Sequence, residues 1–187
     1  MTGPSDQAIQ ELESKINEAD SSEVHRLSRL IASLVFIHLI HGDLQHAHVE
    51  AQRLEAIAQR HSMRLTAAWA SYMLACSHLH VYVLEAALSQ FTAAYEQRYV
   101  LEPMAALDGL VGRALTQQLL GDDDDALETV GLLETFVAEL SVPHYSSMVH
   151  ACRARIAVLQ GDLQTAVERA QLISDKPNPG NLFMWLE

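Results

Sequence analysis

The tetrapeptide Gly42-Asp43-Leu44-Gln45 occurs again as Gly161-Asp162-Leu163-Gln164, 119 positions later in the chain. Gly121-Asp122-Asp123-Asp124 lies between these two copies, and Tyr82-Val83-Leu84-Glu85 stands where a degenerate fourth copy is expected. The interval of 119 is three times about 40, so the copies follow one another at a nearly constant period. A constant period of this length is the sequence signature of a repeat architecture.

Columns of small and apolar residues support the same register. An alanine follows the start of each copy by five positions, at intervals of 40, 39 and 40 residues. Three further columns lie twelve positions before, four after and seven after that alanine. The alanine column is Ala47, Ala87, Ala126 and Ala166, and the column twelve positions before it is Val35, Ala75, Ala114 and Ala154. The column four positions after it is Ala51, Phe91, Val130 and Ala170, and the column seven positions after it is Leu54, Ala94, Leu133 and Ile173.

Each copy is predicted to contain two helices with a glycine turn between them. In the last copy the helical patterns cover residues 147–159 and 163–173. The glycine adopts the left-handed conformation that ends a helix, and the aspartate after it is an N-cap for the next helix. Pro103 and Pro143 stand where the first turn of a helix tolerates proline. No alternating strand pattern is found, so the predicted fold class is all-α.

The predicted domain organisation follows from this register. Residues 1–22 form an N-terminal helix or a partial repeat, residues 23–176 form four helix pairs, and residues 177–187 form a loop and the start of a truncated further repeat. A single pair leaves an apolar face uncovered, so the pairs are expected to stack as a solenoid.

The Gly-Asp-Leu-x-x-Ala turn with small residues around it resembles a tetratricopeptide-type repeat, in a variant longer than the usual length of about 34 residues. This resemblance implies a right-handed superhelix (α-solenoid) of about four tetratricopeptide-like helix pairs. The Trp-x-x-Leu-Gly-x-x-Tyr signature of such repeats is missing.

A closer resemblance covers nearly the whole chain. Seven stretches, in this order, are similar to the superhelical region of the MalT-like, LuxR-type ATP-dependent transcriptional regulators of bacteria. They are residues 41–44 (HGDL), 68–74 (AWASYML), 87–91 (ALSQF), 98–99 (RY), 108–110 (DGL), 151–157 (ACRARIA) and 183–187 (FMWLE).

The resemblance implies a domain context that this chain does not itself contain. In that family an ATPase precedes the helical repeats and a helix-turn-helix follows them, and the repeats bind an inducer or a regulatory protein. This chain has no Gly-x-x-x-x-Gly-Lys-Ser/Thr phosphate loop and no terminal helix-turn-helix. We therefore expect a sensor segment without a cofactor, whose ATPase and DNA-binding domains are missing partners from the same polypeptide.

The composition of the chain limits which cellular compartment and which binding partners we expect. The 187 residues carry a net charge of −12, which argues against direct contact with nucleic acid. Cys76 and Cys152 lie far apart in apolar stretches, as buried cysteines of a reduced, cytoplasmic protein do. The N-terminus has no secretory signal, and the longest apolar run, around residues 31–40, is too short to span a bilayer. A soluble protein without membrane contact is expected.

Metal and catalytic sites are the weaker hypotheses. The ten histidines include His38, His41, His46 and His48, but no carboxylate or cysteine accompanies them at a ligand spacing. The acidic run 122–125 suits a helix N-terminus better than a calcium loop. No catalytic motif is present, so we expect a non-enzyme.

The concave face of the stack is the predicted binding surface, because the first helix of each pair lines it in tetratricopeptide-like stacks. Trp69 and Tyr72 could stack on a sugar or hold an apolar side chain, or they could fill space between neighbouring repeats. Arg29 and Arg155 are predicted to bind a carboxylate or phosphate, and Asp108 to bind hydroxyl groups. The predicted set is Arg29, Phe36, Trp69, Tyr72, Cys76, Asp108, Leu115, Met148 and Arg155.

Two functions remain open at this point. The first is a regulatory sensor domain that binds a small effector or a regulatory protein on its concave face. The second is a stand-alone scaffold that binds a peptide or partner protein and takes no small ligand. Enzyme activity is the third and weakest interpretation.

Overall fold

Helices make up all the regular structure of the residues described by the computed structural model, which are 4–20, 22–142 and 145–173. Within these ranges there are nine α-helices and no strand, so the predicted all-α class is confirmed. The helices are α1 (Pro4–Glu18), α2 (Val24–Ile40), α3 (Leu44–Arg60), α4 (Arg64–His80), α5 (Leu84–Glu96), α6 (Pro103–Leu120), α7 (Asp123–Leu140), α8 (Ser146–Leu159) and α9 (Leu163–Ala170).

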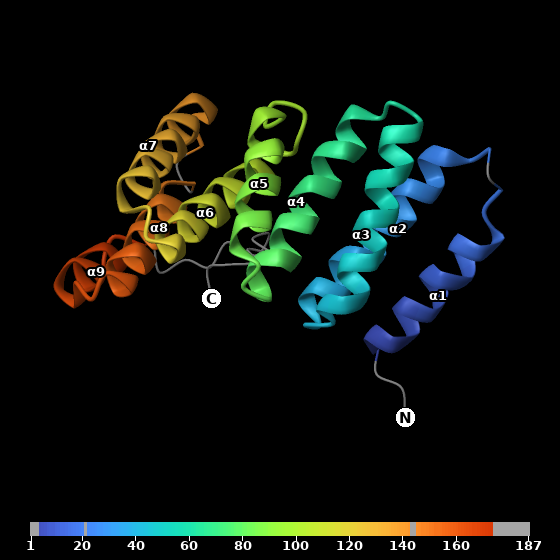
Figure 1. Cartoon of the computed structure of the whole chain (residues 1–187), viewed down its shortest axis with the longest axis horizontal. Coiled ribbons are helices and arrows are strands. Elements are labelled where there is room, and N and C mark those ends of the chain that lie inside the picture. Colours follow the sequence, from blue (N-terminus) through green and yellow to red (C-terminus); the bar gives the residue numbers. More distant parts are fainter. Residues whose placement is uncertain (1–3, 21, 143–144, 174–187) are drawn as a thin grey trace.

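The helices extend along the longest axis of the molecule, from α1 at one end to α9 at the other (Figure 1). Each helix packs against the next one in the chain. The first helices of successive pairs also contact one another, α2 with α4, α4 with α6 and α6 with α8. These contacts place α2, α4, α6 and α8 in one layer. The right-handed superhelix and the number of repeats stay predictions.

One hydrogen-bonding pattern recurs at the turns between helices. At the first turn the N–H of Gly42 donates to the carbonyl of Leu39 (3.1 Å) and the N–H of Asp43 donates to that of His38 (2.9 Å). This is the Schellman motif, which needs a left-handed residue after the helix. The same pair of bonds recurs at the turns around residues 62, 82, 121 and 161.

The left-handed positions confirm the predicted role of glycine and extend it to other residues. Gly42, Gly121 and Gly161 have φ of 72°, 86° and 78°. Ser62 and Tyr82 hold the same conformation, with φ of 52° and 58°, at a conformational cost that glycine avoids. Gly42, Ser62 and Tyr82 are 20 residues apart, so the turn recurs at half the period found in the sequence.

The predicted caps and helix ends are close to those observed. Asp43 and Asp162 accept hydrogen bonds from the N–H groups of His46 and Thr165, as predicted for N-caps, whereas Asp122 makes no such bond. Pro103 is in the first turn of α6. The helix predicted to reach residue 173 ends at Ala170, and a turn follows. Pro143 and residues 177–187 lie outside the described residues.

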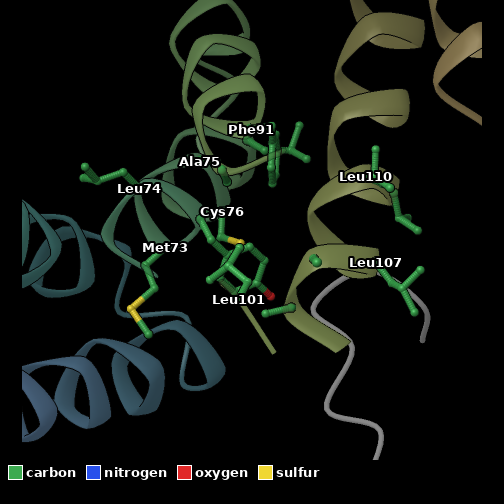
Figure 2. Close-up of a cluster of buried hydrophobic side chains, with 14 of the residues drawn as sticks. Met73, Leu74, Ala75, Cys76, Phe91, Leu101, Leu107 and Leu110 are labelled. Carbon is green, nitrogen blue, oxygen red and sulfur yellow. The ribbon is translucent and has the colours of Figure 1, made fainter. Parts of the chain in front are cut away.

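The repeat columns form much of the core. Ala47, Ala87 and Ala126 are fully buried, and so are the apolar residues four and seven positions further along α3 and α7. Figure 2 shows part of this core, where side chains of α4, α5 and α6 meet, among them Ala75, Phe91 and Leu110. In the last pair Ala170 is exposed, since no further helix of the described chain covers that face.

Gly112 brings α6 unusually close to α5. A methyl group at this position would lie only 2.2 Å from the ring of Phe91, which is itself fully buried. Interiors are packed densely enough that such an overlap forces neighbouring groups off their preferred positions. Gly112 is therefore required by packing, although glycine is a poor helix former.

This contact predicts opposite effects for two glycine substitutions in helices. Gly112→Ala should lower the free energy of unfolding by about 1–3 kcal/mol, because overlap with Phe91 outweighs the gain in helix propensity. Gly131→Ala, on α7, meets nothing within 4 Å and should raise the free energy of unfolding by about 0.5–1 kcal/mol. Urea denaturation of both variants measures the difference, and equal stability of the two would contradict the assigned packing.

Candidate functional site

A groove of about 600 Å³ lies between α2 and α4, with Glu102 at the start of α6 on its border. Pockets that bind small molecules have volumes in this range. The residues that line the groove are Ser28, Arg29, Ala32, Ser33, Phe36, Ile37, Leu54, Leu65, Thr66, Trp69, Met73 and Glu102. Three of the predicted binding residues are among them: Arg29, Phe36 and Trp69.

The groove combines an apolar wall with a few polar groups. Phe36 and Trp69 are half-buried, so each ring presents part of its surface to a ligand. Arg29 is exposed, and its guanidinium forms no hydrogen bond or ion pair with the residues that the structure describes. An apolar wall with few convergent polar groups is typical of a site for small molecules.

Trp69 is in contact with a buried aromatic residue of its own helix, Tyr72. The two rings meet edge to face, with 5.8 Å between their centroids and an interplanar angle of 78°. The hydroxyl of Tyr72 donates a hydrogen bond of 2.6 Å to Oδ2 of Asp108 on α6. Burial raises the pKa of Tyr72 well above its ordinary value, and the Asp108 carboxylate raises it further, so the phenol stays protonated and keeps donating.

The remaining predicted residues lie away from the groove. Tyr72, Asp108 and Met148 are exposed by only 3%, 1% and 2%, so their side chains are not accessible to a ligand in this structure. Cys76 and Leu115 are buried as well. Arg155 is half-buried on α8 and does not line the groove. The structure therefore brings Arg29, Phe36 and Trp69 together and separates them from Met148 and Arg155.

Several lining residues were missed by the sequence analysis, although part of the signal was present. Ser33 lies four residues after Arg29, and Thr66 and Met73 lie three before and four after Trp69. These are helical spacings that place side chains on one face. Glu102 had no comparable signal, because it lies at the end of the irregular α5–α6 connection.

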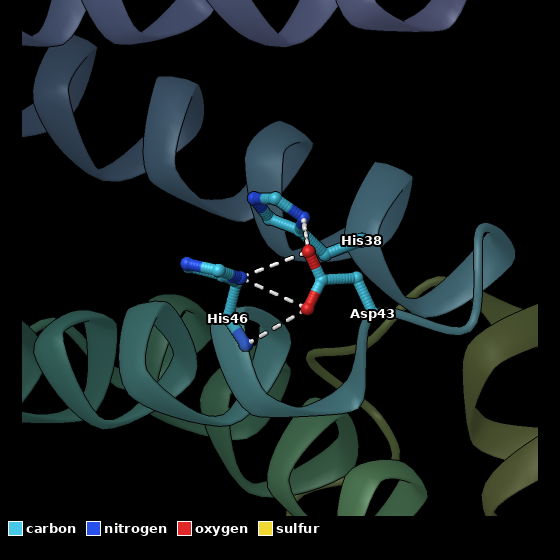
Figure 3. Close-up of polar contacts among 3 residues, drawn as sticks. All are labelled: His38, Asp43 and His46. Carbon is cyan, nitrogen blue, oxygen red and sulfur yellow. Dashed lines mark hydrogen bonds and ion pairs between the residues drawn. The ribbon is translucent and has the colours of Figure 1, made fainter.

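A second polar cluster surrounds the first glycine turn (Figure 3). Nδ1 of His46 lies 2.9 Å from both carboxylate oxygens of Asp43, and Nδ1 of the buried His38 lies 3.3 Å from Oδ2 of the same residue. The two imidazole rings stack with 5.3 Å between their centroids. The hydrogen bond from His46 lowers the pKa of Asp43, and charge interaction with both histidines adds to the effect.

Histidines also meet between α3 and α4. Nδ1 of His48 lies 3.2 Å from the hydroxyl oxygen of Ser77, and its ring contacts that of His78 edge to face. Burial lowers the pKa of His78, and the neighbouring His48 lowers it further. Among the residues that the structure describes, no three His, Cys, Asp or Glu side chains are grouped so that they could hold a metal ion.

Both cysteines are buried free thiols, as predicted. Burial raises the pKa of Cys152 to about 12 and raises that of Cys76 well above its ordinary value. The thiolate is the reactive form of cysteine. Neither side chain is therefore a nucleophile at neutral pH, and both belong to the core.

Comparisons with known proteins add no family assignment. No protein-family model matches the chain, and a search of curated proteins gives no significant match. Within the described residues, no helix combines the length and the apolar character needed to cross a bilayer.

The buried Tyr72–Asp108 contact yields a stability prediction. Tyr72→Phe removes the hydroxyl that donates to a buried carboxylate, and we expect it to lower the free energy of unfolding by about 1–3 kcal/mol. Tyr82→Phe is the matched control, because Tyr82 is 73% exposed at a turn and should behave like the unchanged protein. Chemical denaturation followed by circular dichroism measures both variants. Equal stability of the two would show that the buried hydrogen bond contributes nothing.

The Asp43 cluster yields a prediction of pH dependence. Because folding lowers the pKa of Asp43, its charge stabilises the fold above the ordinary carboxylate pKa, and this stabilisation is lost as the pH falls through the lowered value. The melting temperature of the unchanged protein should exceed that of Asp43→Asn more at pH 6 than at pH 3. The side chain is 41% exposed, so the difference should stay below about 1 kcal/mol. A difference independent of pH would contradict the assignment.

Proposed function

We propose that this chain is a non-catalytic regulatory domain that binds a small effector in the groove between α2 and α4. The observation that carries the proposal is the groove of about 600 Å³, in which two half-buried aromatic rings lie beside the guanidinium of Arg29. Such a site offers apolar contact and one charged anchor, and it brings together no set of catalytic groups. Binding and release of a ligand suit this arrangement better than a chemical step.

The proposed architecture is a right-handed solenoid of about four tetratricopeptide-like helix pairs. The recurrence of the same hydrogen-bonded turn supports it, and so does the burial of equivalent alanines in the first three pairs. In a stack of this kind the groove lies on the layer formed by the first helices, α2 and α4. The proposed regulatory role follows from the resemblance to MalT-like, LuxR-type regulators.

In that context, effector binding would be transmitted to domains outside this chain. An ATPase before the repeats and a helix-turn-helix after them are the partners that the resemblance implies, and the proposed compartment is the cytoplasm. Binding of an effector across α2 and α4 would favour one relative position of the two helices. A ligand shifts such an equilibrium only by its difference in affinity for the two states.

A scaffold for protein partners is the second candidate, and a specific surface favours it. Val81, Tyr82 and Val83, at the α4–α5 turn, are 50%, 73% and 45% exposed. The turns at residues 42, 121 and 161 carry glycine and aspartate instead. Exposed neighbouring apolar residues are typical of an interaction site.

A thermal-shift screen against metabolites, including oligosaccharides and nucleotides, tests the proposed effector binding. A ligand at 100 times its dissociation constant should add about 2.7 kcal/mol, and each kcal/mol raises the melting temperature by roughly 2–4 °C for a domain of this size. We expect a selective shift that Trp69→Ala abolishes. Tyr82→Ala, which changes an exposed turn residue outside the groove, is the matched control and should retain the shift.

The same variants separate the two candidate functions. A flat screen, together with capture of a protein partner that is lost in Tyr82→Ala and retained in Trp69→Ala, would favour the scaffold. A shift that persists in Trp69→Ala would remove the groove as the binding site. Circular dichroism of each variant shows that the fold is intact.

A further inference from the structure

A second cavity, of about 590 Å³, adjoins the groove. The starts of α2 and α4 and the α3–α4 turn form it. Leu65 and Thr66 line both the groove and this cavity, so the two spaces share one wall on α4. A ligand seated along this wall would contact both.

The lining of the second cavity differs in charge from the rest of the chain. Among the described residues that line it are Arg64, His25 and His61, together with hydroxyl groups, and no aspartate or glutamate. The chain as a whole has 24 acidic and 12 basic residues, so a cavity without a carboxylate is not what its composition predicts. The charge of its lining therefore favours the binding of a negatively charged group in this cavity.

The donors in this cavity are available for a ligand. The side chains of Arg64, His25 and His61 form no hydrogen bond or ion pair with other residues of the described ranges. The carboxylate closest in sequence, Glu23, pairs with Arg26 at 2.9 Å. A guanidinium and two imidazoles can therefore donate to the oxygens of a carboxylate or phosphate.

The groove offers the complementary surface. Its wall beside Leu65 carries Phe36, Trp69 and Met73, which suit an aromatic or acyl body. The groove carries one cation and one carboxylate, Arg29 and Glu102, whereas Arg64 shares the second cavity with no carboxylate of the described lining residues. The second cavity therefore has the stronger net attraction for the negative end, and the apolar body lies in the groove.

We infer that the groove and the adjoining cavity together bind one small amphipathic organic anion, with its apolar body against Phe36 and Trp69 and its carboxylate or phosphate at Arg64, His25 and His61. This inference rests on the proposed function, since it names the chemical class of the effector. Neither cavity alone specifies the class. Because Leu65 and Thr66 line both spaces, one ligand can contact the aromatic rings of the groove and the cationic side chains of the cavity at the same time.

Four probes test this inference: octyl phosphate, octanoate, 1-octanol and inorganic phosphate, each below any micelle-forming concentration. In a Trp185→Phe background Trp69 is the single tryptophan, and its fluorescence reports binding in the groove. We expect octyl phosphate, octanoate or both to bind at least tenfold more tightly than 1-octanol and than inorganic phosphate. Binding of only one of the two anions would identify the headgroup.

Two substitutions and a control locate the negative end. Arg64→Gln should weaken binding of the octyl anion about tenfold or more and leave 1-octanol unchanged, and His61→Gln provides a second variant if Arg64→Gln does not fold. Arg60→Gln is the matched control, because Arg60 ends α3 and lines neither cavity. Its affinities should equal those of the unchanged protein.

The outcomes separate this inference from the proposed function. Equal affinity for 1-octanol and the octyl anions, or full affinity in both Arg64→Gln and His61→Gln, would overturn the inference. Failure of all four probes would overturn it too. In each case a shift in the metabolite screen that depends on Trp69 would leave the proposed effector site standing.

Discussion

The structure depends on reversing the chain at left-handed turns. A helix ends cheaply where the next residue adopts positive φ and two backbone N–H groups satisfy its last carbonyls. Gly42, Gly121 and Gly161 adopt this conformation without steric strain. Ser62 and Tyr82 adopt it because the helices on both sides are already fixed by packing. Because five turns share these bonds, consecutive helices pack side by side, and the alanine columns meet in the core.

Small residues then decide how closely the helices approach. The fully buried Ala47 and Ala87 have little side-chain volume, and Gly112 has none to separate α6 from Phe91. Phe36 on α2 and Trp69 on α4 are only half-buried, and both line the groove. The groove therefore lies between two helices that contact each other in one layer.

A buried set of contacts connects the groove residue Trp69 with α6. Tyr72 is buried, bonded to Asp108 on α6 and in edge contact with Trp69. This chain of contacts connects a groove residue on α4 with the core of the next helix pair. A ligand that moves Trp69 would act on that contact, so the connection gives a physical path by which occupancy could affect neighbouring pairs.

The sequence by itself determined the helical class, the glycine turns and the buried positions of the columns in the first three helix pairs, because these depend on local conformation and on helical spacing. It also identified Arg29, Phe36 and Trp69, which share a groove because their helices are neighbours in successive pairs. Only the tertiary structure placed Tyr72, Asp108 and Met148 in the interior and Arg155 away from the groove. Spacing along a helix says which residues share a face, but burial depends on which helix covers that face. The cavity beside Arg64 could be found only in the tertiary structure for the same reason, because His25 and His61 line it from the ends of different helices.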